Sequence, residues 1–131
     1  MPPFVRPEKP LDRSRLALVT TGGVHLQSQS RFDIDDFEGD CSYREIPTEA
    51  KDLTWTHAYH RPDEGSDLDA VFPLKTTRGL VEEGLVGELA PRHFSFMGAI
   101  HDPTPLVEAT APEVAKKLVE DGVDAVLLTP S

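Results

Sequence analysis

The chain has 131 residues, of which 38% are hydrophobic and 27% charged, and its formal net charge is −10. This size and composition are typical of one globular domain, and an acidic balance without a basic stripe argues against nucleic acid and membrane-surface partners. No apolar run approaches the ~18 residues of a membrane span, and the amino terminus lacks the apolar core of a secretory signal, so we expect a cytoplasmic protein.

The amino-terminal part begins with an arm, a strand and a long loop. Residues 1–14 are rich in proline and predict an extended arm, which leaves 15–131 as a single α/β domain. The apolar run at 15–20 predicts a buried strand, and the Thr-Gly-Gly sequence at 21–23 predicts the turn that ends it. Residues 27–50 are polar and strongly acidic, which predicts a long acidic surface loop.

The middle of the chain predicts a second strand and a helix. Residues 53–57 alternate apolar and polar side chains, as a strand does. A helix is expected to open at 71–73, because proline is tolerated in a first helical turn, and to end at Gly84. Residues 85–89 predict a short strand or turn, and 90–98 are expected to form a loop.

The last two elements complete an alternating order. A helix is expected to start at Thr110, with Glu113 three residues on as in a capping box, and to close at Gly122. The continuous apolar run 123–129 predicts a parallel strand covered on both faces. Strands that alternate with helices predict an open, mostly parallel sheet flanked by helices, of the flavodoxin or Rossmann kind.

The last predicted strand lies very close to the end of the given sequence. A parallel strand covered on both faces normally continues into a crossover helix, but here Ser131 follows almost at once. We therefore expect the domain to be incomplete after this strand. Either a second polypeptide or a second copy completes the sheet, or the sequence is one piece of a longer protein.

Three segments are expected to meet at the carboxyl edge of the sheet, where open α/β sheets bind ligands. The first is the turn at Thr20, Thr21, Gly22 and Gly23, whose exposed amides would suit an anion, although a plain tight turn explains the glycines equally well.

The second segment carries two histidines, His57 and His60, which would suit hydrogen bonding, proton transfer or substrate contact. Together with His25 they could also hold a metal, although the pair lacks the cysteines or the helical glutamate frame of common zinc sites.

The third segment, 91–98, contains Arg92, which would suit a carboxylate, and His93, which would suit proton transfer. An ordinary surface ion pair is the alternative for Arg92. Cys41 is the one cysteine, so no internal disulfide can form, and its acidic neighbours disfavour a reactive thiolate.

Several blocks of the sequence together resemble one known family. These blocks are LALVTTGGVHLQSQSRFD (16–33), GDCSYREIP (39–47), VFPL (71–74), GELAPRHFSFMG (87–98) and DGVDAVLLTP (121–130). They resemble the glycine/sarcosine/betaine and D-proline reductase selenoprotein B family in its short stand-alone form. The resemblance implies a reactive selenocysteine or cysteine just after the strand at 123–129, which would cleave a carbon–nitrogen bond reductively. Cys41 does not match that position.

The sequence therefore predicts part or a subunit of a reductase-like enzyme acting on a small amino acid or related compound. Its selenol or thiol would come from beyond Ser131 or from a partner chain, with no cofactor held by this chain itself. The expected substrate contacts are Thr20, Thr21, Gly22, Gly23, Arg92 and Thr129, and the expected proton carriers are His57, His60 and His93. Two alternatives remain: a non-catalytic subunit or small-molecule binding module, and a metal-dependent lyase or hydrolase using His25, His57 and His60.

Overall fold

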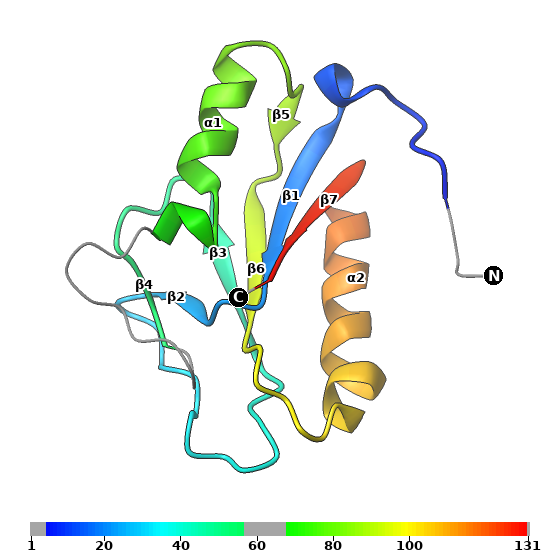
Figure 1. Cartoon of the computed structure of the whole chain (residues 1–131). Helices are drawn as coiled ribbons and strands as arrows, with labels where there is room; N and C mark the ends of the chain where they lie inside the picture. The colour runs from blue at the N-terminus through cyan, green and yellow to red at the C-terminus, as the bar shows by residue number, and fades with distance from the viewer. Residues whose placement is uncertain (1–4, 57–67, 131) are drawn as a thin grey trace.

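The structure is a computed structural model that describes residues 5–56 and 68–130. A central sheet lies between two helices, α1 on one face and α2 on the other (Figure 1). The α/β class expected from the sequence is confirmed. The helices are α1 (Leu74–Glu82) and α2 (Ala111–Glu120), and the strands are β1 (Arg15–Thr20), β2 (Val24–Leu26), β3 (Tyr43–Pro47), β4 (Leu53–Trp55), β5 (Glu88–Leu89), β6 (Arg92–Phe96) and β7 (Ala125–Thr129).

The main sheet is mixed and has β1 at its centre. On one side β1 pairs with β7 in parallel, from Leu16 opposite Ala125 to Thr20 opposite Thr129. On the other side β1 pairs in parallel first with β5 and then with β6. β3 lies outside β6 and runs antiparallel to it. Four of the five strands are therefore parallel, and the carboxyl ends of β1, β6 and β7 share one edge.

Two apolar clusters hold the helices to the sheet, because successive side chains of a strand point to opposite faces. Leu18 of β1 packs with Ile46, Phe72 and Leu74 on the α1 face. On the α2 face Val19 of β1 packs against the cluster of Phe94, Phe96 and Val114. The alternation along β1 thus serves both cores, which explains why its sequence is apolar throughout.

Two strands occupy segments that were expected to be loops, so those expectations were wrong. β6 (Arg92–Phe96) lies inside 90–98, and β3 (Tyr43–Pro47) lies inside the proposed acidic loop 27–50. Four of the five β6 residues are buried, which a strand covered by helices on both faces requires. The pattern was missed because its histidine and serine look polar, yet both are buried in the core.

The strand expected at 53–57 forms over a shorter range, but it does not join the parallel sheet. β4 (Leu53–Trp55) pairs antiparallel with β2, with Val24 opposite Trp55, in a separate two-stranded sheet. The turn after β1 turns the chain back, and Val24 then packs beside Leu18 on the α1 face. Its placement in the main sheet was therefore a wrong expectation.

Both helices end as expected, but α2 starts differently. Gly84 and Gly122 follow the two helices with φ of 80° and 69°, the left-handed conformation that glycine adopts readily. Thr110 itself has helical angles and makes no side-chain capping bond, because a π-helical turn at Leu106–Thr110 runs directly into α2. The expected capping box is therefore absent.

β7 forms where the last strand was expected, but it is not covered on both faces. It is an edge strand: within the described part of the chain, β1 is its one neighbour. Leu128 is 70% exposed, and Val126 and Leu127 are each 40% exposed. The apolar side chains of β7 therefore form a surface that the rest of the described chain leaves exposed. No helix in the described ranges is long and apolar enough to cross a membrane.

Candidate functional site

The carboxyl edge of the sheet brings together several of the expected site residues. Thr20 of β1 lies opposite Thr129 of β7 and, on its other side, opposite Ser95 of β6. The turn formed by Thr21, Gly22 and Gly23 continues directly from Thr20. This register brings the first turn and the end of the last strand to the same edge.

The threonine hydroxyls at this edge point into the protein. Thr20 is fully buried, and its Oγ1 donates to the carbonyl oxygen of Val71 at 2.8 Å. The Oγ1 of Thr129 donates to the same oxygen, also at 2.8 Å. The two hydroxyls therefore fasten β1 and β7 to the segment that leads into α1.

The turn amides are also used internally, contrary to the exposed amides expected from the sequence. The amides of Thr21 and Gly23 donate to the carbonyls of Thr129 (3.1 Å) and Phe96 (2.9 Å). The amide of Gly22 donates to Thr20 Oγ1 at 3.0 Å. The glycines therefore serve close packing of the turn, and their part in substrate binding stays a prediction.

His57 and His60 lie outside the described residues, so their roles stay predictions. His25 is described, and both of its ring nitrogens have partners inside the fold. Nδ1 lies 2.8 Å from the carbonyl oxygen of Leu26, and Nε2 lies 3.0 Å from Thr56 Oγ1. Within residues 5–56 and 68–130, no group of three or more potential ligands could hold a metal ion.

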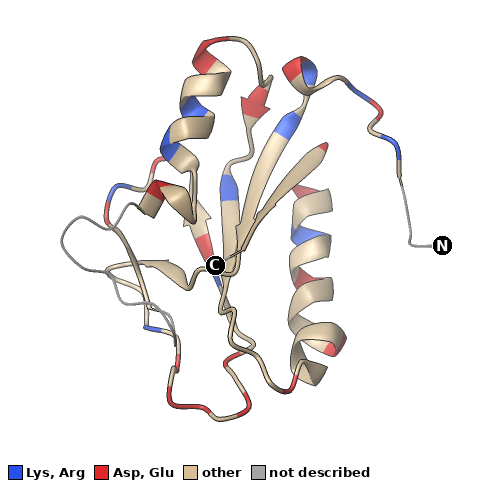
Figure 2. Cartoon of the chain, in the orientation of Figure 1, with Lys and Arg blue, Asp and Glu red and all other residues tan. Residues whose placement is uncertain are grey.

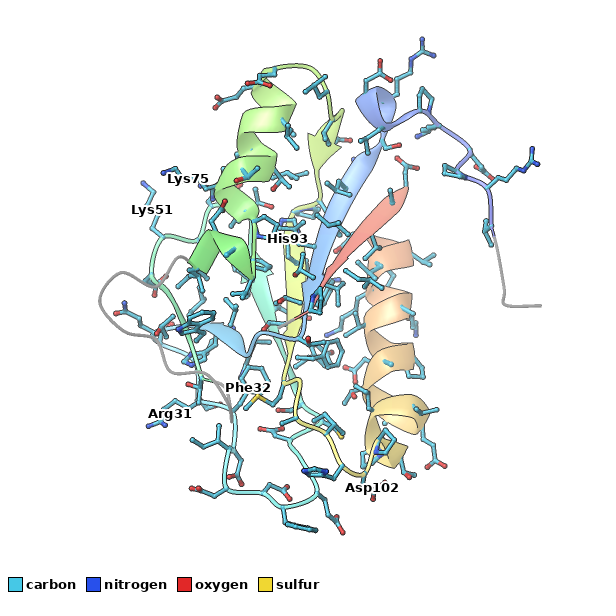
Figure 3. The ribbon with its side chains drawn as sticks, viewed as in Figure 1. Arg31, Phe32, Lys51, Lys75, His93 and Asp102 are labelled. Carbon is cyan, nitrogen blue, oxygen red and sulfur yellow. The ribbon has the colours of Figure 1, made fainter. Side chains whose placement is uncertain are left out.

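His93 is the second residue of β6 and does not lie at the carboxyl edge, so its expected place was wrong (Figure 3). Its ring is fully buried, and Nδ1 accepts the amide hydrogen of Leu18 at 2.9 Å. This requires the proton on Nε2, which donates to Thr48 Oγ1 at 2.8 Å. Thr48 Oγ1 in turn donates to the carbonyl of Ala90.

The chain of hydrogen bonds through His93 repairs a gap in the sheet. β1 pairs with β5 at Leu16 and with β6 from Val19 onward, so Leu18 lies between the two pairings. The imidazole of His93 accepts the hydrogen bond of the Leu18 amide, which has no partner among the described strands on this side of β1. Burial, with a smaller contribution from Arg78, lowers the pKa of His93 from 6.5 to about 4. A histidine this acidic is neutral at pH 7.

Arg92 is the first residue of β6 and therefore lies away from the carboxyl edge, where it was expected. Its Nε and Nη2 donate to the two carboxylate oxygens of Asp121 at 2.7 and 3.2 Å, and its Nη1 donates to Glu45 at 3.2 Å. Lys117 Nζ also donates to Glu45, at 2.5 Å. The Lys117 ammonium first, and Arg92 second, lower the pKa of Glu45. The guanidinium joins α2 to the sheet.

Two further polar groups complete the description of the site region. Cys41 is buried, and its Sγ lies 3.6 Å from the carbonyl oxygen of Asp102. Ser95 Oγ is buried at the carboxyl end of β6 and has no hydrogen-bond partner among the described residues. Sequence reasoning missed Ser95, because a single serine between two phenylalanines carries no signal of its own.

Comparison with known proteins decides the family. The family model described as glycine/sarcosine/betaine reductase selenoprotein B matches residues 3–131. The chain belongs to this selenoprotein B family. The resemblance drawn from the sequence blocks is thereby confirmed.

Curated relatives of this selenoprotein B family member are subunits of reductase complexes. The D-proline reductase gamma subunit of Acetoanaerobium sticklandii is 41% identical over 132 residues, covering 98% of this chain and 53% of that protein. The sarcosine reductase component B beta subunit of Peptoclostridium acidaminophilum is 33% identical, in a match that covers 92% of this chain and 29% of that protein. The glycine reductase component B gamma subunit of the same organism is 30% identical, covering 98% and 32%.

The chain thus spans about half the length of the D-proline reductase subunit, and less of the other two proteins. No solved structure matches it.

Proposed function

We propose that the chain is a subunit or part of a reductase complex that reductively cleaves a bond in a small amino acid or related compound. The observation that carries this proposal is the family match over residues 3–131, to which the named relatives add glycine, sarcosine and D-proline reductases. The substrate would lie at the carboxyl edge formed by Thr20 and Thr129, the usual ligand edge of such sheets.

The reactive selenol or thiol would come from beyond Ser131 or from a partner chain. Cys41 is a poor candidate, since it is buried and its sulfur faces the carbonyl of Asp102. In the cleavage, a selenolate or thiolate would displace the amine from carbon, and the amine would leave with a proton. A second thiol would then attack the chalcogen, so that carbon takes up a proton and a selenylsulfide or disulfide forms.

The open edge of β7 supports a partner that completes the sheet. Leu128 lies in register with Val19, so it faces the α2 side, where Val119 of α2 is also exposed. An added parallel strand would pair with the free edge of β7, and its crossover helix would cover these apolar side chains. An open, mostly parallel sheet of the flavodoxin or Rossmann kind, as predicted from the sequence, would have this arrangement.

The test is purification of the tagged chain from its own cells as an intact complex. We expect a second selenium- or thiol-bearing polypeptide in the complex, detected by intact mass and selenium content. With a dithiol reductant, the complex should cleave one of glycine, sarcosine, betaine or D-proline, and alkylation of the selenol should abolish turnover. A complex without such a group, inert toward all four compounds, would refute the proposal.

A non-catalytic subunit is the second candidate, and the side-chain positions favour it. His93 and Arg92, two expected reactive groups, are both committed to holding the sheet together. If the chain only binds and positions its partner, replacing Thr129 with valine should leave kcat and KM of the complex unchanged. A rise in KM of about tenfold or more would instead assign Thr129 to the substrate site.

A further inference from the structure

A pocket lies at the amino edge of the sheet, away from Thr20 and Thr129. It has a volume of about 460 Å³ and is bordered by α1, by β5 and by the segment that follows β3. This volume lies within the ~300–1,000 Å³ of small-molecule sites. The proposed reductase function does not use this part of the molecule.

The pocket combines an apolar wall with two cations. Val81 and Leu89 supply the apolar surface, while Arg78 and Lys51 supply the positive charges. Arg78 uses part of its guanidinium to donate to the carbonyl of Thr48. The ion pairs among the described residues involve neither Arg78 nor Lys51. The remaining donors of Arg78 can therefore take a ligand.

Carboxylates of the same pocket restrict the kind of ligand. Glu49 and Glu82 also line it, and both are exposed, whereas the third acid, Glu88, pairs with Arg15 at 3.0 Å. A simple anion would be repelled by the acids and a simple cation by Arg78. A ligand that carries one negative and one positive group can pair with Arg78 and with the two glutamates at the same time.

We propose that this pocket binds a small zwitterion that carries a carboxylate, an ammonium group and a short aliphatic body. The carboxylate lies on Arg78, whose planar guanidinium suits paired hydrogen bonds to two oxygens. The ammonium faces Glu49 and Glu82, and the aliphatic body covers Val81 and Leu89. The site is separate from the proposed catalytic edge.

The structure supplies an internal reporter for occupancy. Thr48, whose carbonyl accepts from Arg78, also holds Nε2 of His93 through its hydroxyl at 2.8 Å. A carboxylate that draws the guanidinium toward the pocket changes this contact. We therefore expect the imidazole nitrogen resonances of His93 to move when the ligand binds.

The experiment uses three matched probes and the purified chain. Valine is the zwitterion, isovalerate is the same body without the ammonium, and isobutylamine is the same body without the carboxylate. Calorimetry and nitrogen NMR should find binding of valine with a Kd in the millimolar range or tighter, with both other probes at least tenfold weaker. His93 resonances should shift with valine alone.

Variants place the ligand in the pocket. Arg78→Gln and Arg78→Lys should each weaken valine binding at least tenfold, and Glu82→Gln should weaken it at least threefold. Lys75→Gln is the matched control, because Lys75 lies on the same helix and does not line the pocket (Figure 3). It should change Kd less than twofold.

Three outcomes would overturn the proposal. They are no binding at valine concentrations up to ~50 mM, binding of isovalerate as tight as that of valine, or a loss of valine affinity in Lys75→Gln equal to that in Arg78→Gln. None of these readouts involves turnover, so they leave the proposed reductase function untouched.

Discussion

His93 illustrates how strongly burial changes the role of a titratable side chain. In the sequence it looks like a proton carrier, because an unperturbed histidine titrates near neutral pH. In the fold it accepts from Leu18 and donates to Thr48, so it is a neutral structural group. Its lowered pKa, about 4, follows from desolvation of the charged form first and from Arg78 second.

This pKa makes stability depend on pH in a defined window. The unfolded chain binds a proton at His93 near pH 6.5, whereas the folded chain does so only near pH 4. The contribution of His93 is therefore complete above pH 6.5 and decreases as the pH falls toward 4. The total loss is about 3 kcal/mol, at ~1.4 kcal/mol for each pH unit of the window.

Urea unfolding at pH 7, 5.5 and 4.5 measures this effect against His93→Gln, which cannot titrate. We expect the wild-type free energy of unfolding to fall more steeply than that of the variant. Glu45 and Asp40, whose carboxyl pKa values are lowered, also lose stabilisation as the pH falls to 4.5 and below. They do so equally in both proteins and therefore do not produce this difference. A His93 resonance that titrates near pH 6.5 would contradict the assignment.

The turn after β1 and the helix α1 place opposite demands on glycine. Gly23 has a φ of 69°, and a Cβ there would lie 2.0 Å from the carbonyl oxygen of Thr56. Gly79, inside α1, has nothing within 4 Å of the same position. The first glycine is required by the geometry of the turn, and the second weakens the helix by its backbone freedom.

Gly23→Ala and Gly79→Ala therefore form a matched pair with opposite expected signs. Gly23→Ala should lower the free energy of unfolding by well over ~1 kcal/mol, because the backbone of Thr56, just after β4, must move to admit a methyl group. Gly79→Ala should raise it by about 0.5–1 kcal/mol. Thermal and urea unfolding of both variants provide the measurement. A stable Gly23→Ala protein would mean that the turn is looser than described.

The molecule as a whole presents two different surfaces beside its carboxyl edge. Acidic positions follow the loop of residues 31–42, which projects past the ends of β1 and β7 (Figure 2). The free edge of β7 is instead apolar, with Leu128 its most exposed residue. A charged loop stays in water, whereas an apolar strand edge pairs readily with another chain.

Leu128→Lys should therefore weaken association of the chain with its complex. We expect at least a tenfold loss of partner from the purified complex, because a lysine on an edge strand opposes strand addition. Leu85→Lys is the control, since Leu85 is 55% exposed on the far side of the molecule, between α1 and β5. Native mass spectrometry counts the partner in each preparation. Equal loss in both variants would argue against β7 as the contact.

The elements that depend on local pattern were predictable. The continuous apolar run of β1 and the glycines that close α1 and α2 act within a few residues, so Arg15–Thr20, Gly84 and Gly122 were placed correctly. The family could also be recognised, since sequence blocks such as 16–33 and 87–98 are long and specific.

Strand pairing and burial were not predictable, because they depend on residues far apart in the chain. The fold of 90–98 is set by β1 and β3, whose residues lie more than 40 positions away. That pairing places Arg92 at the start of β6, away from the carboxyl edge, and buries His93. Local sequence therefore determined the first strand and the ends of both helices. Long-range packing decided that Tyr43–Pro47 and Arg92–Phe96 become strands, and which polar side chains remain free for chemistry.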